Sequence, residues 1–111
     1  MLSIPEYQKK AHETADYLGM DKGVFTYPVM GLAEEAGEVV GKFAKAIRDN
    51  GAVIDEQRLT EIKKELGDVC WMLAEICTNQ KIELEEVMQM NLDKLASRKA
   101  RGVIHGSGDN R

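Results

Sequence analysis

Apolar residues recur every three or four positions in four separate segments of the chain, and glycine and polar residues fill the gaps between them. This spacing places apolar side chains on one face of a helix. The segments predict helices over approximately residues 4–18, 32–50, 55–79 and 83–101. Ser3 and Asp55 stand where their side chains can cap the first and third of these helices.

No segment alternates between apolar and polar residues with a period of two, so no sheet is expected. Gly19, Gly23 and Pro28 predict a loop between the first two helices. After Gly102 the chain has no helical period, which predicts a glycine-rich tail over residues 103–111 that is a loop or a flexible arm. The pattern therefore predicts one all-α domain over residues 1–102, built as a four-helix bundle.

The composition suggests that the core of one chain is small. The 111 residues include three tyrosines, two phenylalanines and one tryptophan, so aliphatic side chains must fill most of the interior. Many short helical chains gain stability by burying further apolar area between subunits. Assembly of the chain into an oligomer is therefore expected.

Charge and hydropathy limit the partners of the protein. The net charge is −4 and the basic residues are spread over the chain, which argues against a nucleic-acid polymer as partner. No run approaches the ~18 apolar residues of a membrane span, and the N-terminus lacks the pattern of a signal peptide. Cys70 and Cys77 stand ~10 Å apart along one helix, too far for a disulfide. A soluble, cytoplasmic protein with reduced, buried thiols is expected.

Acidic residues gather beside the apolar face of two predicted helices. These residues are Glu34, Glu35 and Glu38 on the second helix and Glu61, Glu65 and Asp68 on the third. One interpretation is an ordinary solvated surface, in which pairs such as Glu38 with Lys42 contribute about 0.3–0.5 kcal/mol. However, like charges three or four residues apart destabilise a helix unless a cation lies among them. The clustering on both helices therefore favours a bound divalent cation.

Antiparallel packing of the second and third helices would bring two acidic pairs face to face: Glu35 with Glu38, and Glu65 with Asp68. Four carboxylates without nitrogen or sulfur ligands select Mg²⁺, with Mn²⁺ as a possible substitute, rather than zinc. A di-iron bundle needs histidines on the acidic helices, and His12 and His105 lie elsewhere.

The strings around these acids resemble a known family. Gly-Leu-Ala-Glu-Glu-Ala-Gly-Glu-Val at 31–39 and Lys-Glu-Leu-Gly-Asp-Val-Cys-Trp at 64–71 are similar to the MazG-like branch of the all-α nucleotide pyrophosphohydrolases. The resemblance extends through residues 91–98 to the Gly-Ser-Gly-Asp-Asn-Arg ending. It implies that Glu35, Glu38, Glu65 and Asp68 hold Mg²⁺. It also implies dimers or tetramers in which the nucleotide lies against helices of the neighbouring subunit.

Candidate substrate-binding residues lie on the third and fourth helices. Asn91 interrupts the apolar stripe of the fourth helix, and Lys94 and Arg98 continue on the same side, which favours phosphate contacts. The resemblance points the same way for Asn91 and Lys94, whereas Arg98 depends mainly on helix geometry. Trp71 lies beside the acidic edge of the third helix, where it can pack at a subunit interface or stack on a base.

The expected reaction is hydrolysis of a nucleoside triphosphate to the monophosphate and pyrophosphate, by attack of water on the α-phosphorus. Glu38 is the candidate general base. The alternative is a non-catalytic helical adaptor whose acidic patches bind a basic partner. Within the family, the substrate can instead be a modified nucleotide or a phosphoribosyl compound. Base and sugar preference and the cellular purpose, such as house-cleaning of the nucleotide pool, stay open.

Overall fold

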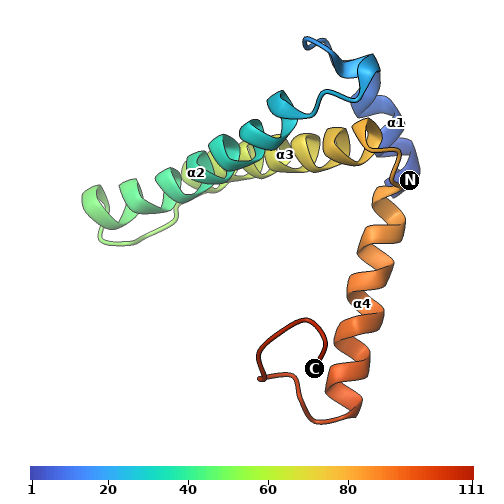
Figure 1. Ribbon diagram of the computed structural model, residues 1–111. Coiled ribbons are helices and arrows are strands. Elements are labelled where there is room, and N and C mark those ends of the chain that lie inside the picture. Colours follow the sequence, from blue (N-terminus) through green and yellow to red (C-terminus); the bar gives the residue numbers. More distant parts are fainter.

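The computed structural model describes all 111 residues, Met1–Arg111, and contains four α-helices, one short 3-10 helix and no strand (Figure 1). The elements are α1 (Ile4–Glu13), η1 (Met20–Lys22), α2 (Thr26–Asp49), α3 (Glu56–Asn79) and α4 (Leu84–Ala100). The prediction of an all-α chain with four helices is confirmed. None of these helices is long and apolar enough to cross a membrane.

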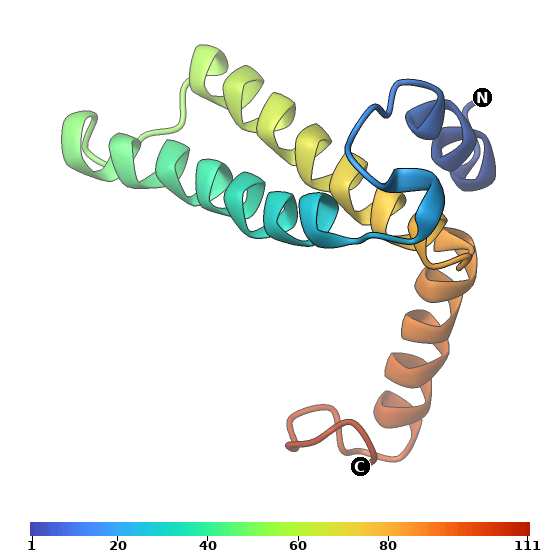
Figure 2. The ribbon, with the colours of Figure 1, turned by 45° about the horizontal axis from the view of Figure 1, so that its top comes forward.

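The longest helices, α2 and α3, form an antiparallel hairpin, and α1 packs across the C-terminal part of α3 (Figures 1 and 2). Helix α4 leaves the end of α3 at a steep angle and packs only near the junction of α1 and α3. The four helices therefore do not close into a bundle within one chain. Three of them pack together, and most of α4 stands apart.

The boundaries of the last two helices and both caps agree with the sequence prediction. The Ser3 side chain accepts a hydrogen bond from the backbone N–H of Glu6 at 3.2 Å. Asp55 accepts one from the N–H of Arg58 at 2.8 Å. Each bond satisfies a donor that the first turn of a helix leaves free.

The boundaries around the first loop were predicted wrongly. Helix α1 ends at Glu13 rather than near Leu18, because the hydroxyl of Thr14 donates to the carbonyl of Ala11 and the chain then turns away. Helix α2 begins at Thr26, so Pro28 lies in its first turn instead of in a loop. Proline is tolerated there because the first N–H groups of a helix have no partner within the helix.

The buried core is small and lies where α1 crosses α3. Ala11, Ala74, Cys77 and Leu84 form it, with Ile4, Tyr7 and Trp71 packed against them. In contrast, several apolar residues of the hairpin and most of the apolar stripe of α4 are exposed, since α4 packs against α1 and α3 only near their junction. They include Val40, Phe43, Ile47, Leu66, Leu73, Val87, Met88, Leu92 and Leu95.

Both cysteines are free, as the sequence predicts, but only Cys77 is buried and Cys70 is exposed. The expectation that both thiols are buried was therefore wrong for Cys70. The reason is again the open arrangement: Cys70 lines a mainly apolar cavity of about 250 Å³ with Leu84 and Met88 of α4 and residues of the N-terminal segment.

Helices α2 and α3 approach closely at Gly31. A β-carbon added at Gly31 would lie 2.5 Å from the sulfur of Met72, which is itself buried. The absence of a side chain at this position lets Met72 pack directly against the backbone of α2. This contact fixes the spacing of the hairpin near the residues that carry the acidic cluster.

We expect Gly31→Ala to lower the free energy of unfolding by up to about 1 kcal/mol, because the clash of the added methyl group with buried Met72 outweighs the helix propensity that alanine gains over glycine. In a Met72→Ala background the same change should cost much less, because the clashing atoms are absent. Urea unfolding of the four proteins of this cycle measures both effects. Equal costs in the two backgrounds would contradict the close approach.

Candidate metal centre

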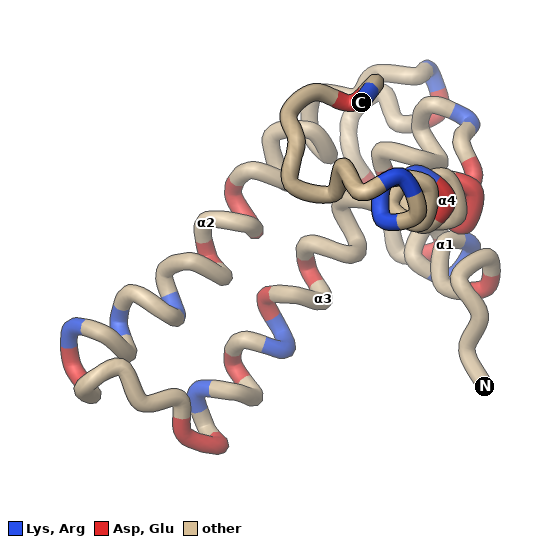
Figure 3. The backbone as a smooth tube through the Cα atoms, turned by 90° about the horizontal axis from the view of Figure 1, so that it is seen from below, with Lys and Arg blue, Asp and Glu red and all other residues tan.

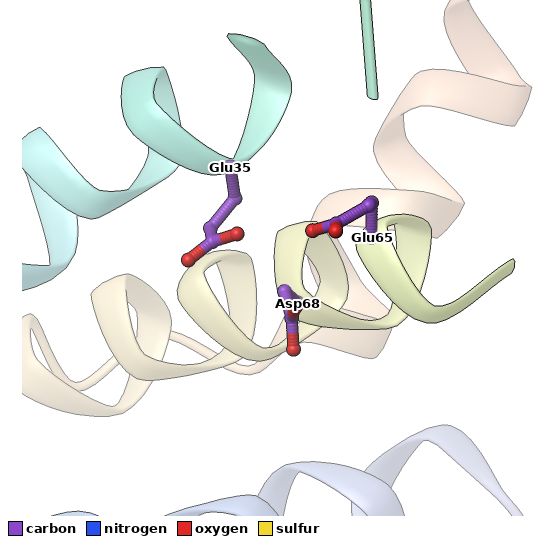
Figure 4. Close-up of side chains that lie close together, drawn as sticks. All are labelled: Glu35, Glu65 and Asp68. Carbon is purple, nitrogen blue, oxygen red and sulfur yellow. The ribbon is translucent and has the colours of Figure 1, made fainter. Parts of the chain in front are cut away.

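Three carboxylates meet at the seam of the α2–α3 hairpin. Glu35 lies on α2, and Glu65 and Asp68 lie one turn apart on α3 (Figure 4). One oxygen from each side chain lies within 4.8 Å of the others. The antiparallel packing brings them together, because Glu35 lies about as far before the turn of the hairpin as Asp68 lies after it.

No basic side chain compensates this cluster: none of the salt bridges in the structure involves Glu35, Glu65 or Asp68. Figure 3 shows acidic positions facing each other across this part of the hairpin, with basic positions of α2 gathered toward its turn. Burial raises the pKa of Glu35, and the charges of Asp68, Glu34, Glu65 and Glu38 raise it further. The arrangement is therefore short of positive charge.

The donor set fits a hard cation. All three side chains offer carboxylate oxygens, and no histidine or cysteine belongs to the group. Magnesium and manganese are commonly bound by such oxygens together with water, whereas zinc prefers nitrogen and sulfur ligands. The structure thus brings together three of the four residues predicted as metal ligands.

Glu38, the fourth predicted ligand, does not belong to the close group of oxygens. It lies one turn after Glu35 on α2 and its side chain is exposed. Its roles as ligand and as general base stay predictions. Glu34 lines the cavity next to Glu35, and Glu61 lies one turn before Glu65 on α3.

Two cavities adjoin Glu35. The larger, of about 600 Å³, is mainly apolar and lies beneath the loop before α2; its lining includes Tyr17, Leu18, Val24, Tyr27, Met30, Glu34 and Glu35. The rings of Tyr17 and Tyr27 stack with centroids 5.4 Å apart. The smaller, of about 320 Å³, is lined by Thr14, Tyr27, Glu35, Asp68, Trp71 and Met72.

Trp71 was predicted to lie near the acidic edge, and it lines the same cavity as two of the acids. Tyr17 and Tyr27 were not predicted as site residues. The available signal was the presence of tyrosines on both sides of a glycine-containing loop, but only the folded chain brings the two rings together.

The residues predicted on α4 lie apart from the acidic cluster within one chain, because α4 diverges from the hairpin (Figure 1). Asn91 is exposed, Lys94 is half-buried and Arg98 is only 4 % exposed. The tail folds back onto the last two: Asp109 lies 3.2 Å from Lys94 Nζ, and Arg98 Nη2 donates to the Asp109 carbonyl at 2.9 Å. Hydrogen bonds from Lys94 and Arg98 lower the pKa of Asp109.

A second group of polar residues was missed. Glu75 on α3 is completely buried, and both of its carboxylate oxygens lie 3.2 Å from Nδ1 of His12. The sequence gives little warning, because an acidic residue at this point of a helix looks like part of a solvated face. His12 received no role in the sequence analysis, and the structure gives it a buried partner.

The fold and the cluster define an all-α protein with a candidate site for a hard cation. The MazG nucleotide pyrophosphohydrolase domain matches residues 28–103, which include all four predicted ligands. The chain is 44 % identical over 115 residues to the Gene 37 protein of Mycobacterium phage L5, across 99 % of this chain and 100 % of that protein. No solved structure matches. The chain belongs to the MazG nucleotide pyrophosphohydrolase family, as its resemblance implied, and thus to a family of hydrolases that act on nucleotides.

The raised pKa of Glu35 predicts how stability depends on pH without a divalent cation. A carboxyl whose pKa is higher in the folded state binds its proton more tightly there, so stability falls as pH rises from the ordinary value of 4.5 through the raised value. Glu35→Gln removes this penalty and should be more stable than wild type at neutral pH, by about 0.5 kcal/mol.

Urea unfolding with a chelator, at neutral pH and below pH 4.5, tests this prediction. The advantage of Glu35→Gln should disappear at the lower pH, where the wild-type carboxyl is protonated. Added Mg²⁺ should stabilise the wild type and not the variant. A variant that is less stable than wild type at neutral pH in chelator would contradict crowding of like charges.

Proposed function

We propose that the protein is a magnesium-dependent nucleoside triphosphate pyrophosphohydrolase, which converts a (d)NTP to the (d)NMP and pyrophosphate. The observation that carries the proposal is the uncompensated cluster of Glu35, Glu65 and Asp68 beside two cavities, in a chain of the MazG family. These three residues would hold the cation, with Glu38 as a further ligand. Bound Mg²⁺ lowers the pKa of coordinated water and neutralises charge on phosphoryl oxygens.

In this reaction the oxygen of water forms a bond to the α-phosphorus, and the bond from that phosphorus to the bridging oxygen of pyrophosphate breaks. A carboxylate must accept the proton of the attacking water. Glu38 is the candidate, since it lies one turn from Glu35 and its exposed carboxylate is free of any salt bridge. Helices hold these groups rigidly, which favours positioning as a source of rate.

The two cavities are the proposed place of the nucleoside. The stacked rings of Tyr17 and Tyr27 offer an apolar wall for a base next to Glu35, and Trp71 offers a second aromatic surface beside Asp68. Stacking of a base on an aromatic side chain contributes about 1–3 kcal/mol without demanding one particular base.

The proposal includes a homodimer or homotetramer. The apolar faces of α4 and of the hairpin are exposed in one chain, and a second copy offers surfaces of matching character. Such an assembly would bring Asn91, Lys94 and Arg98 of one subunit to the phosphates bound at the acidic cluster of its neighbour. This supplies the positive charge that the cluster and a triphosphate lack within a single chain.

Pyrophosphate release from a panel of ribo- and deoxyribonucleoside triphosphates tests the function, with Mg²⁺ and with chelator. Glu65→Gln should lower turnover by about 100-fold or more, because it removes a charged ligand and keeps the shape of the side chain. Glu61→Gln is the matched control, since Glu61 lies one turn earlier on α3 and outside the cluster.

The outcomes separate the proposal from its rival. A folded protein that releases no pyrophosphate from any triphosphate in Mg²⁺ would overturn the enzymatic function. Unchanged behaviour of Glu65→Gln, together with loss of a basic partner on neutralising the acidic helices, would instead favour the adaptor.

The tail supplies a further prediction. Asp109 forms salt bridges with Lys94 and Arg98, the residues proposed to bind phosphate. A triphosphate must therefore displace the Asp109 carboxylate. Asp109→Asn should lower the KM by about 3–10-fold at low salt, by weakening an internal competitor. Steady-state kinetics measures this change, with Asp93→Asn on α4 as control. A raised KM would mean that Asp109 orients Lys94 and Arg98 for substrate instead.

A further inference from the structure

The C-terminal half of α3 carries a row of three polar side chains, Trp71, Glu75 and Asn79, spaced four residues apart and therefore on one face of the helix. Trp71 and Asn79 contact the segment that joins α1 to α2, and Glu75 contacts the last turn of α1. We call this row the α3 ridge.

The contacts of the α3 ridge follow the chain in order. Trp71 Nε1 donates to the hydroxyl of Thr14 at 2.9 Å, just after the end of α1. Glu75 lies against His12 in the last turn of α1. Asn79 donates from Nδ2 to the carbonyl of Val24 at 2.8 Å and to the hydroxyl of Tyr17 at 3.3 Å. The ridge thus holds both ends of the connection over residues 14–25.

This connection needs such support. It contains only the three-residue helix η1, and Gly19 and Gly23 on either side of it adopt positive φ angles of 78° and 72°. Segments with few helical hydrogen bonds and little buried apolar surface open easily unless side chains tie them down. The ridge supplies hydrogen bonds of this kind.

Glu75 is the member of the α3 ridge whose burial is energetically unfavourable by itself. Its side chain is 0 % exposed, and burying a carboxylate is unfavourable unless partners compensate it. His12 is its hydrogen-bonding neighbour, and the charge of Glu75 also contributes, after burial, to raising the pKa of Tyr17. The Glu75 carboxylate therefore joins α3 to the last turn of α1 through His12.

The residues that the ridge holds are also residues that line the cavities. Tyr17 and Val24 belong to the wall of the larger cavity beside Glu35. Thr14 and Trp71 line the smaller one with Asp68, which lies one turn before Trp71 on the same helix. One rigid helix therefore carries metal-centre residues and also fixes the distance from them to the movable cavity wall.

We propose that Glu75 and Asn79 are positioning residues that hold residues 14–25 at a set distance from the metal centre and thereby determine which nucleoside the cavities accept. The inference rests on the proposed function, because it assigns the cavities to the nucleoside. It makes neither residue a catalytic residue, since both act through Tyr17, Val24 and His12.

The test compares Asn79→Ala with Gln8→Ala. Gln8 is a matched control because its side chain also joins separate elements by hydrogen bonds: it links α1 to Thr78 at the end of α3 and to Ile82 and Leu84 after it. It lines neither of the cavities beside Glu35. Both variants lose side-chain hydrogen bonds and should be destabilised, but only Asn79→Ala frees the cavity wall.

Three readouts are measured on the full chain: amide hydrogen exchange of residues 14–25, kcat and KM for each triphosphate, and binding of α,β-methylene triphosphate analogues of each base in Mg²⁺. Asn79→Ala should speed exchange in this segment by about 5–10-fold, the loss expected for one or two hydrogen bonds. It should raise the KM for the triphosphate of the preferred base, and thereby reduce the ratio of the KM values of the other bases to that of the preferred base by a similar factor. The kcat should change little. Gln8→Ala should leave this ratio of KM values unchanged.

Glu75→Gln provides a second variant with nearly the same shape. Removal of the charge should lower the pKa of Tyr17, which absorbance titration against Tyr17→Phe detects, and should relax the ratio between bases in the same direction. Unchanged exchange of residues 14–25 and an unchanged base ratio in Asn79→Ala would overturn the inference. An equal change in Gln8→Ala would also overturn it, because the effect would then be general destabilisation.

The failures of the two proposals are distinguishable. Analogue binding without turnover in the wild type would sink the proposed reaction, while the base ratio for binding would still decide the role of the ridge. A wild type that binds no nucleotide would overturn both.

Discussion

Like charges held at the seam of two helices are the feature on which the rest of the structure depends. Glu35, Glu65 and Asp68 approach one another without a basic partner, and burial together with neighbouring acids raises the pKa of Glu35. Two long antiparallel helices can hold such a group because their packing contacts offset the repulsion. The close approach at Gly31 and Met72 fixes the spacing of the pair just ahead of Glu35. The cluster therefore has the geometry and the excess negative charge suited to a hard cation.

The open arrangement of the chain keeps its basic residues on α4 away from the acidic cluster. Helix α4 stands away from the hairpin with exposed apolar residues, while its last turns carry Lys94 and Arg98. In one chain these cations are satisfied by Asp109 of the tail rather than by the acidic cluster. An assembly of two or more copies would cover the apolar surfaces and bring opposite charges together, so one packing event would serve stability and substrate binding alike.

The α3 ridge links the rigid and irregular parts of the molecule. Asp68, Trp71, Glu75 and Asn79 follow one another along α3, and they lead from the acidic cluster to contacts with α1 and the chain before α2. Because one helix carries all of them, α3 connects Glu65 and Asp68 to the residues that line the cavities. The buried carboxylate of Glu75 adds a contact with His12 in the last turn of α1, next to the start of the segment that contains only the short helix η1.

The amino-acid sequence determined the helical class, the caps at Ser3 and Asp55 and the limits of α3 and α4, since these follow from local periodicity and from hydrogen bonds between near neighbours. It also predicted that Glu35, Glu65 and Asp68 lie close together, because the spacing of residues along a helix shows which of them share a face. It did not determine the end of α1 at Glu13 or the start of α2 at Thr26, where contacts from α3 and the turn chemistry of Thr14 outweigh the apolar pattern. Only the tertiary structure decided that Tyr17 meets Tyr27, that Glu75 is buried against His12 and that α4 stands apart. These features arise between residues far apart in the chain, and no local spacing encodes them.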